Sequence, residues 1–206
     1  MIDKKEQILL AAQELFAENG FSGTTTRMLA AKAGVNLGML TYYFGTKWQI
    51  FQALIEKRNK DFGAIIQDAL HEGEDEFEVL DKMIDAFFDY FMSNASFQRC
   101  LYREMSLCKD SPEMEFAVQH IVRNRQRIAD FIQKGIENGK FRQVDVYLTI
   151  SAFTGLIFHT LHAESFALKM MNENPKTDSI FSEKIQTRLK VFIKDYLRSQ
   201  LSISRR

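Results

Sequence analysis

The sequence predicts an all-α protein of about nine helices. Apolar residues recur at helical spacing in every long segment, and no segment shows the alternation that a β-strand would require. Only two prolines occur, Pro112 and Pro175, and both lie between helical patterns. An apolar share of 46% is enough to build a sizeable core. The helices are expected at residues 4–19, 26–33, 37–43, 47–71, 76–93, 97–107, 112–137, 146–171 and 179–200.

Residues 24–51 carry several helix-boundary signals in close succession. Gly34 stands where a left-handed C-terminal cap favours glycine. Asn36 is predicted to cap the next helix, because its side chain can accept from a free backbone N–H. That helix is about two turns long, and Thr46 and Gln49 then form a capping box that opens the following helix. Two short helices separated by a glycine turn predict a helix-turn-helix, which binds DNA.

Further residues stand at fixed offsets around this motif: Ile8, Ala12, Leu15, Phe16, Gly20, Phe21, Thr25, Thr26, Phe44, Lys47 and Ile50. With them, roughly the first 60 residues resemble the DNA-binding domain of the tetracycline-repressor (TetR) family. Thr41 departs from that pattern, because the family usually carries a phosphate-contacting tyrosine there. The resemblance implies a helix-turn-helix domain over residues 1–60 and a helical effector-binding and dimerisation domain over residues 61–206.

The second short helix is expected to enter the major groove with its N-terminal half leading. Leu37 and Met39 could make apolar contacts with a thymine methyl. Asn36 could bond a base or simply cap its helix. Lys47, in the first turn of its helix, is expected to hold a phosphate, because free N–H groups there attract anions. The residues predicted to contact DNA are Thr26, Arg27, Asn36, Leu37, Gly38, Met39, Thr41, Tyr42 and Lys47.

Aromatic residues around the motif are expected to divide between core and surface. Thr41 and Tyr42 are predicted to be exposed, whereas Tyr43 is predicted to be partly buried. The residues interpreted as core are Phe16, Leu40, Phe44, Trp48 and Phe51.

The helix at 146–171 is apolar almost all round, with one stripe of large side chains and another that contains small ones. A helix that is apolar on two faces is buried on two sides. Together with the last helix, it predicts a four-helix dimer interface, two helices from each chain. The alternative is that both faces belong to a monomer core. The predicted interface residues are Gly155, His159, Leu189, Phe192 and Tyr196.

The central helices are rich in phenylalanine and methionine. One interpretation is a packed core, and the other is an apolar cavity with a few polar groups. The resemblance to the TetR family favours a cavity for a small, largely apolar effector. The residues predicted to line it are Phe87, Phe91, Cys100, Met105, Phe116, His120 and Phe153.

Charge is balanced overall but uneven along the chain. Residues 1–60 carry eight Lys/Arg and five Asp/Glu, whereas residues 61–98 carry Lys82 alone against ten acids. We interpret the acidic stretch as a solvated helix face and a loop, pointing away from DNA. His159 and His162 beside Glu164 are too weak a pattern to predict a metal site.

Several functional classes lack support in the sequence. We find no glycine-rich phosphate loop, nucleophile elbow or plausible carboxylate pair, so neither an enzyme nor a cofactor is expected. No run of 18 apolar residues occurs, and the N-terminus does not resemble a signal peptide, so a bacterial cytoplasmic protein without membrane contact is expected.

The expected function is that of a homodimeric transcriptional repressor, released from a palindromic double-stranded DNA operator by an apolar effector. One alternative is a dimeric DNA-binding protein that needs no ligand. The other is a helical ligand carrier or enzyme whose N-terminal resemblance is structural only.

Overall fold

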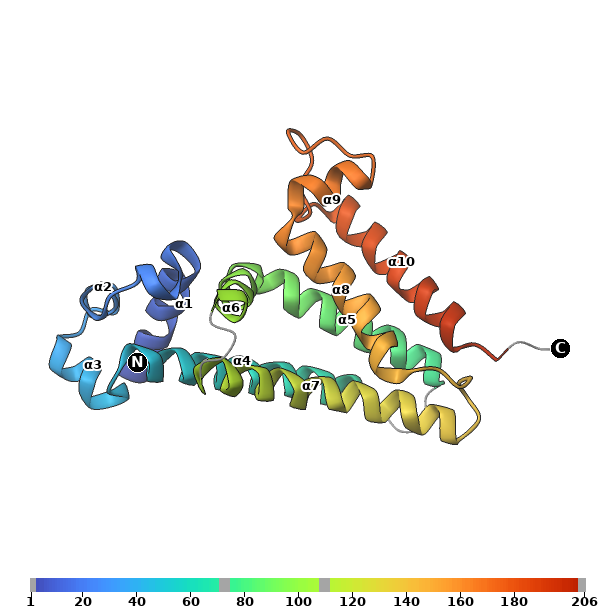
Figure 1. The fold of residues 1–206 in the computed structure, drawn as a ribbon, viewed down its shortest axis with the longest axis horizontal. Coiled ribbons are helices and arrows are strands. Elements are labelled where there is room, and N and C mark those ends of the chain that lie inside the picture. Colours follow the sequence, from blue (N-terminus) through green and yellow to red (C-terminus); the bar gives the residue numbers. More distant parts are fainter. Residues whose placement is uncertain (1–2, 71–74, 108–111, 204–206) are drawn as a thin grey trace. The chain divides into compact units, whose positions relative to one another are not determined.

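The computed structural model describes residues 3–70, 75–107 and 112–203, without the side chains of residues 112–114. Over these ranges the chain forms ten α-helices and no strand (Figure 1). The all-α class is therefore confirmed. The helices are α1 (Lys4–Gly23), α2 (Thr26–Lys32), α3 (Leu37–Phe44), α4 (Lys47–Ala69), α5 (Glu76–Ser93), α6 (Ala95–Leu107), α7 (Pro112–Glu137), α8 (Val146–His162), α9 (Glu164–Met170) and α10 (Glu183–Leu201).

Contacts between residues divide the chain into two units, which we describe separately. Unit 1 combines the described parts of residues 1–61 and 94–122, and unit 2 combines those of 62–93 and 123–206. The sequence predicts one boundary near residue 60, whereas the chain passes between these two units three times, after residues 61, 93 and 122. The division into the two predicted domains remains a prediction. Unit 1 also contains α6 and the start of α7, because α6 packs directly on α1.

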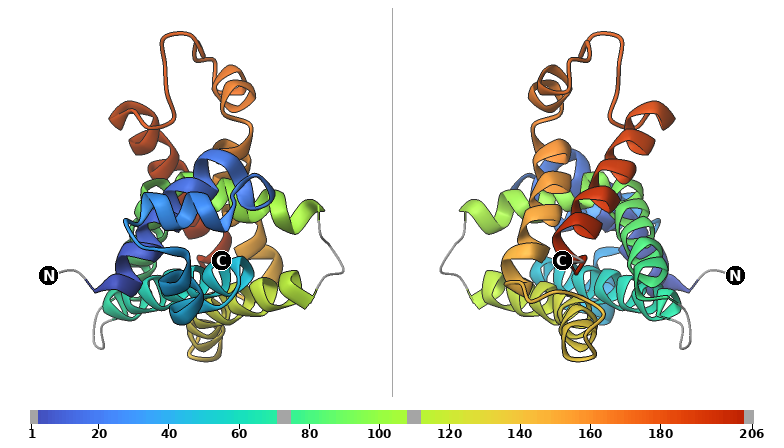
Figure 2. Two further views of the ribbon diagram at one scale, coloured as in Figure 1. Left: turned by 90° about the vertical axis from the view of Figure 1, so that its left-hand side faces the viewer. Right: turned by 90° about the vertical axis from the view of Figure 1, so that its right-hand side faces the viewer.

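Unit 1 is built around one apolar core. Helix α1 packs against α2 and α6, and α2 packs against α3 (Figures 1 and 2). Phe51 of α4 lies at the centre, with its ring 5.2 Å from that of Phe16 and 6.2 Å from that of Phe97 on α6. Phe16, Leu40 and Phe51 are fully buried, and Phe44 and Trp48 pack against them. The predicted core assignments are confirmed.

Unit 2 contains a cluster of phenylalanine rings where α5 and α8 pack together. Phe87 stacks on Phe91 at 4.3 Å, and Phe153 of α8 meets Phe87 edge-on at 5.4 Å. Phe62 lies 5.4 Å from Phe87, and Phe158 lies 5.2 Å from Phe91. All five side chains are at most 9% exposed. Offset and edge-on ring pairs of this kind stabilise a core beyond simple burial.

Helices α5 and α10 are joined by a row of ion pairs. The acids stand four residues apart on α5 and the bases four apart on α10, so each set lies along one face of its helix. The pairs are Asp81–Arg198, Asp85–Lys194 and Asp89–Lys190, with N–O distances of 2.9, 2.6 and 2.6 Å. The interpretation of the acidic stretch as merely solvated is wrong for these three aspartates. Residues 72 and 74, also acidic, lie outside the described residues.

The helix predicted at residues 146–171 is two helices in the structure. Ala163 leaves the helical conformation, with φ −121° and ψ 44°, and α9 begins at Glu164. The Glu164 carboxylate accepts from the Ser179 hydroxyl and from the Ile180 N–H, which ties the start of α9 to the segment before α10. Among the described helices none alone is long and apolar enough to cross a membrane, and only the pair α8 and α9, bent by 114°, meets that test together.

Candidate nucleic-acid interface

Short-range hydrogen bonds set the ends of α2, α3 and α4. Gly34 follows α2 with φ at +63°. The Asn36 carboxamide oxygen accepts from the Met39 N–H at 2.7 Å, so this side chain caps α3. The Gln49 side-chain oxygen accepts from the Thr46 N–H at 2.9 Å, and the Thr46 hydroxyl oxygen accepts from the Gln49 N–H at 3.2 Å. The predicted turn, cap and capping box are confirmed, and they present α3 as a separate two-turn helix.

The face of α3 that points away from the core is exposed. Leu37 is 45% exposed and Tyr42 is 84% exposed, and Gly38 and Thr41 lie between them on the same face. Tyr43 is partly buried, as predicted, and its ring lies 5.3 Å from that of Tyr42. The Thr41 hydroxyl donates to the Leu37 carbonyl at 3.0 Å, so this residue also bonds its own helix.

The remaining predicted contacts lie beside this face. Arg27 is exposed, and Thr26 and Met39 are partly buried. A Cβ atom at Gly38 would meet only the Asn36 carboxamide, at 3.3 Å, so no neighbouring helix requires a glycine there. A missing side chain on an exposed recognition helix allows close approach of another molecule's backbone.

Lys47 is bonded inside unit 1, which the sequence did not reveal. Its ammonium donates to the Phe21 and Thr24 carbonyls at 2.7 and 2.8 Å and lies 4.3 Å from the centre of the Phe21 ring. Burial lowers the pKa of this ammonium, and the charge of Glu104 acts in the opposite direction. An ammonium has three donors, so a third can still reach a phosphate, and the predicted phosphate contact remains a prediction.

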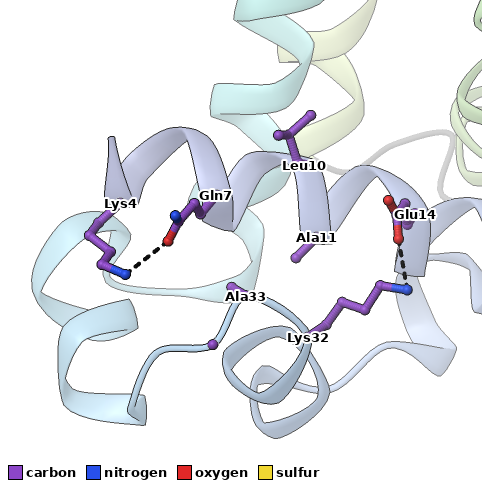
Figure 3. A pocket seen from close by; sticks show the side chains of 8 residues that line it. Lys4, Gln7, Leu10, Ala11, Glu14, Lys32 and Ala33 are labelled. Atoms are coloured by element: carbon purple, nitrogen blue, oxygen red, sulfur yellow. Dashed lines mark hydrogen bonds and ion pairs between the residues drawn. The ribbon is translucent and has the colours of Figure 1, made fainter. Parts of the chain in front are cut away.

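A shallow pocket of about 480 Å³ lies between α1 and the end of α2 (Figure 3). Lys32 of α2 pairs with Glu14 of α1 at 2.7 Å, and Lys4 bonds Gln7 on α1 at 3.0 Å. The Lys32–Glu14 ion pair crosses the pocket and links α2 to α1.

A second exposed apolar surface lies on unit 2. Along α8, Leu148 is 69% exposed, Gly155 and His159 are exposed, and a Cβ atom at Gly155 would meet nothing within 4 Å. On α10, Phe192 is 58% exposed and Tyr196 is partly buried. The predicted interface residue Leu189 is an exception. It is only 5% exposed and lies in the buried stripe of α10, so it offers little surface in this chain, and its assignment to a dimer interface remains a prediction.

The residues predicted to line an effector cavity fall in different units. Phe87, Phe91 and Phe153 belong to the ring cluster of unit 2. Cys100, Met105 and Phe116 pack in the core of unit 1, where burial raises the pKa of the Cys100 thiol to about 11. The His120 ring lies 4.2 Å from that of Phe116. That these seven side chains line one cavity remains a prediction.

The histidines bond their own helices. The Nδ1 atoms of His120 and His162 lie 2.9 and 2.8 Å from the carbonyls of Phe116 and Phe158. His159 meets the edge of the Phe166 ring at 5.6 Å. Among the described residues, no group of three or more His, Cys, Asp or Glu side chains could hold a metal ion.

Within unit 1, α1, α2 and α3, with the capped and solvent-facing α3 following a glycine turn, have the arrangement of a helix-turn-helix. The family model described as "Bacterial regulatory proteins, tetR family" matches residues 8–54. The match covers the described parts of α1, α2 and α3 and the start of α4, so this N-terminal region is similar to the regulatory proteins of that family.

Three known proteins show how far the similarity extends. The transcriptional activator FasR of Mycolicibacterium smegmatis is 24% identical over 48% of this chain, which spans only 46% of FasR. The transcriptional repressor KstR2 of the same species is 25% identical over 68% of each chain. The crystal structure of FadR from Bacillus subtilis in complex with stearoyl-CoA superposes with a TM-score of 0.72, covering 96% of this chain and 99% of FadR at 21% identity. This last likeness establishes the fold.

Proposed function

We propose that the protein is a homodimeric transcriptional repressor that binds a palindromic operator in the bacterial cytoplasm and leaves it when an effector binds. The exposed face of α3 carries this proposal, because Leu37, Gly38, Thr41 and Tyr42 lie together on a capped helix outside the core. Hydroxyl groups and a close backbone suit phosphate contacts, and apolar side chains suit the thymine methyl group. FasR is named an activator and KstR2 a repressor, and the choice of a repressor follows KstR2, which is matched over the larger share of this chain, 68% against 48%.

Dimerisation is proposed through α8 and α10. The second apolar stripe of α8, including Leu148 and Gly155, faces solvent in the monomer instead of filling its core. Phe192 adds a large exposed ring on α10. An obligate interface resembles a protein core cut in half, and a twofold dimer presents two recognition helices to the two halves of a palindrome.

We propose a long acyl chain, carried as a coenzyme A thioester, as the effector. FadR binds stearoyl-CoA, and an aromatic-rich cluster like that of unit 2 suits a hydrocarbon chain once its rings separate. The Arg125 guanidinium lies 5.8 Å from the centre of the Phe158 ring. A positive charge at the edge of an apolar cluster suits the anionic part of such a ligand.

The direct test is a pair of titrations with stearoyl-CoA, one into free protein and one into protein saturated with operator. The operator is first selected from a random duplex library. Linkage requires both ligands to weaken each other by the same factor, roughly 5-fold to 150-fold. Equal affinities in the two titrations would favour the ligand-independent DNA-binding protein, and selection of no duplex would favour a carrier.

Removal of the Lys47 ammonium tests the phosphate contact. We expect Lys47→Ala to weaken binding to every duplex and to reduce the slope of log K against log salt by about 0.9, because one phosphate contact is lost. The measurement is fluorescence anisotropy over a range of salt concentrations. Lys60→Ala is the matched control, since Lys60 is an exposed lysine on the same helix. A salt slope equal to that of the control would show that the Lys47 ammonium binds only the Phe21 and Thr24 carbonyls and no phosphate.

Arg125 tests the class of effector. We expect Arg125→Ala to weaken stearoyl-CoA binding by roughly 10-fold to 150-fold, because a charge-assisted hydrogen bond contributes roughly 1.5–3 kcal/mol. Binding of the uncharged methyl stearate should hardly change. Arg123→Ala, at an exposed neighbouring position on α7, is the control. Calorimetric titration measures the affinity for both ligands. Equal losses of affinity for stearoyl-CoA and for methyl stearate would show that Arg125 does not bind the anionic head group.

A further inference from the structure

Helix α6 brings an Arg-Glu pair against the end of α1. Arg103 and Glu104 stand side by side, with the Arg103 Nε 3.6 Å from the Glu104 carboxylate. Arg103 also covers Gly20, since a Cβ atom built on Gly20 would overlap its guanidinium and lie 2.7 Å from its Cζ. The guanidinium therefore rests directly on the backbone of α1.

Gly20 is the point where α1 changes direction. Its φ of +73° and ψ of 173° are far from helical and are accessible essentially to glycine alone. The buried Thr24 hydroxyl closes this bend, because it can donate its one proton to either the Leu15 or the Gly20 carbonyl, at 3.0 and 2.7 Å. The bend thus sets the direction of the two carbonyls just beyond it, those of Phe21 and Thr24.

Those two carbonyls hold the Lys47 ammonium. The chain of contacts therefore runs from Arg103 on α6, through the bend at Gly20, to the first turn of α4. Glu104 adds to it, because its carboxylate is buried, with the residue only 4% exposed. Its negative charge favours the charged form of the Lys47 ammonium. A buried carboxylate needs compensating cations, and unit 1 supplies Arg103 and Lys47.

We propose that Arg103 is a positioning residue for DNA binding. Its guanidinium, seated on the bend of α1, fixes the carbonyls that hold Lys47 and so directs the remaining N–H of that ammonium toward an operator phosphate. This inference rests on the proposed function. It assigns a part in DNA binding to a helix that lies more than 40 residues beyond the motif in the sequence. Arg103 itself need not touch DNA.

A double-mutant cycle with Lys47 separates positioning from general stabilisation. We expect Arg103→Ala to weaken operator binding by roughly 3-fold to 30-fold and to lower the salt slope by about 0.9, as Lys47→Ala does. The double variant should then be no weaker than Lys47→Ala alone, because both changes remove one contact. Lys60→Ala, which removes an exposed positive charge from unit 1, should leave the salt slope unchanged. Additive losses, or an unaltered slope in Arg103→Ala, would overturn the proposal.

A second measurement needs no DNA. Trp48 is the chain's one tryptophan, and its ring lies 5.8 Å from that of Phe21. We expect Arg103→Ala to change the Trp48 emission spectrum and to speed hydrogen exchange of the amides of residues 20–28, while exchange in unit 2 stays the same. Unchanged emission and exchange would refute the positioning role even if the wild-type protein bound no duplex. Failure of the wild type alone to bind DNA would instead refute the proposed function.

Arg103→Lys is a second variant that keeps the proposal testable if Arg103→Ala does not fold. Lysine retains the charge but lacks the planar guanidinium that covers Gly20. We expect this variant to fold, with the thermal unfolding midpoint of the wild type, and to show the same change in Trp48 emission and in salt slope as Arg103→Ala. A lysine variant with wild-type emission and slope would show that charge alone matters and would contradict the positioning role.

Discussion

Replacement of Phe192 by aspartate is expected to convert the protein to a monomer and to weaken operator binding by a hundredfold or more. Phe192 is 58% exposed on α10, on the opposite side of its buried stripe from the lysines that pair with α5. A charge buried without a partner at an apolar interface is strongly unfavourable. Loss of the dimer also removes the second recognition helix, and bivalent attachment contributes roughly 10²- to 10⁴-fold.

Val191→Asp is the matched control for this experiment. Val191 is 53% exposed and adjacent in sequence, but it lies about 100° further round α10, facing away from the buried stripe. We expect that variant to remain dimeric and to bind operator. Sedimentation velocity gives the assembly state, and anisotropy gives the operator affinity. A folded Phe192→Asp dimer with full affinity would remove α10 from the proposed interface.

Replacement of Gly20 by alanine is expected to lower the free energy of unfolding of unit 1 by about 3 kcal/mol, the upper end for one strained residue. Two costs add at this position. The backbone conformation suits glycine alone, and the new methyl group would overlap the Arg103 guanidinium. Unfolding by guanidinium chloride, followed by Trp48 fluorescence, measures the stability of unit 1 directly, because Trp48 packs against Phe21 and Phe51.

Gly34→Ala gives a reference value for an alanine at a positive φ without steric overlap. Gly34 also has a positive φ, of 63°, but a Cβ atom there meets nothing within 4 Å. We expect this variant to lose only about 1 kcal/mol, the cost of the left-handed conformation. Equal losses in the two variants would contradict the prediction, because they would mean that neither the overlap with Arg103 nor the glycine-only backbone conformation of Gly20 adds a cost.

The features that the sequence predicted are those set by neighbouring residues. The Asn36 cap and the Thr46–Gln49 capping box each depend on groups three residues apart, so a short stretch of sequence determines them. The buried and exposed sides of α3 follow in the same way from helical spacing. The division between Tyr42 and Tyr43 could therefore be predicted without the structure.

What the sequence missed depends on residues that meet only after folding. Lys47 bonds carbonyls 23 and 26 residues away, and Arg198 reaches Asp81 across 117 residues. No periodicity within one helix reports such pairs. The bend at Ala163 carries no glycine or proline signal, so periodicity alone extended one helix through it. The burial of Leu189 within its own chain could not be predicted either, because helical spacing shows that a face is apolar but not which neighbour covers it.

The discontinuity of unit 1 has a consequence for how the protein is made. A ribosome adds roughly 5–20 residues per second, so α6 follows residue 61 by a few seconds. Until then the newly made α1 and α4 lack Phe97, Cys100 and Leu101, which complete their core. Part of the apolar surface of the nascent helix-turn-helix therefore stays exposed until α6 is synthesised, and we expect chaperones to bind it during that time. A graft that transfers operator specificity to another regulator should carry α6 along with the first 61 residues.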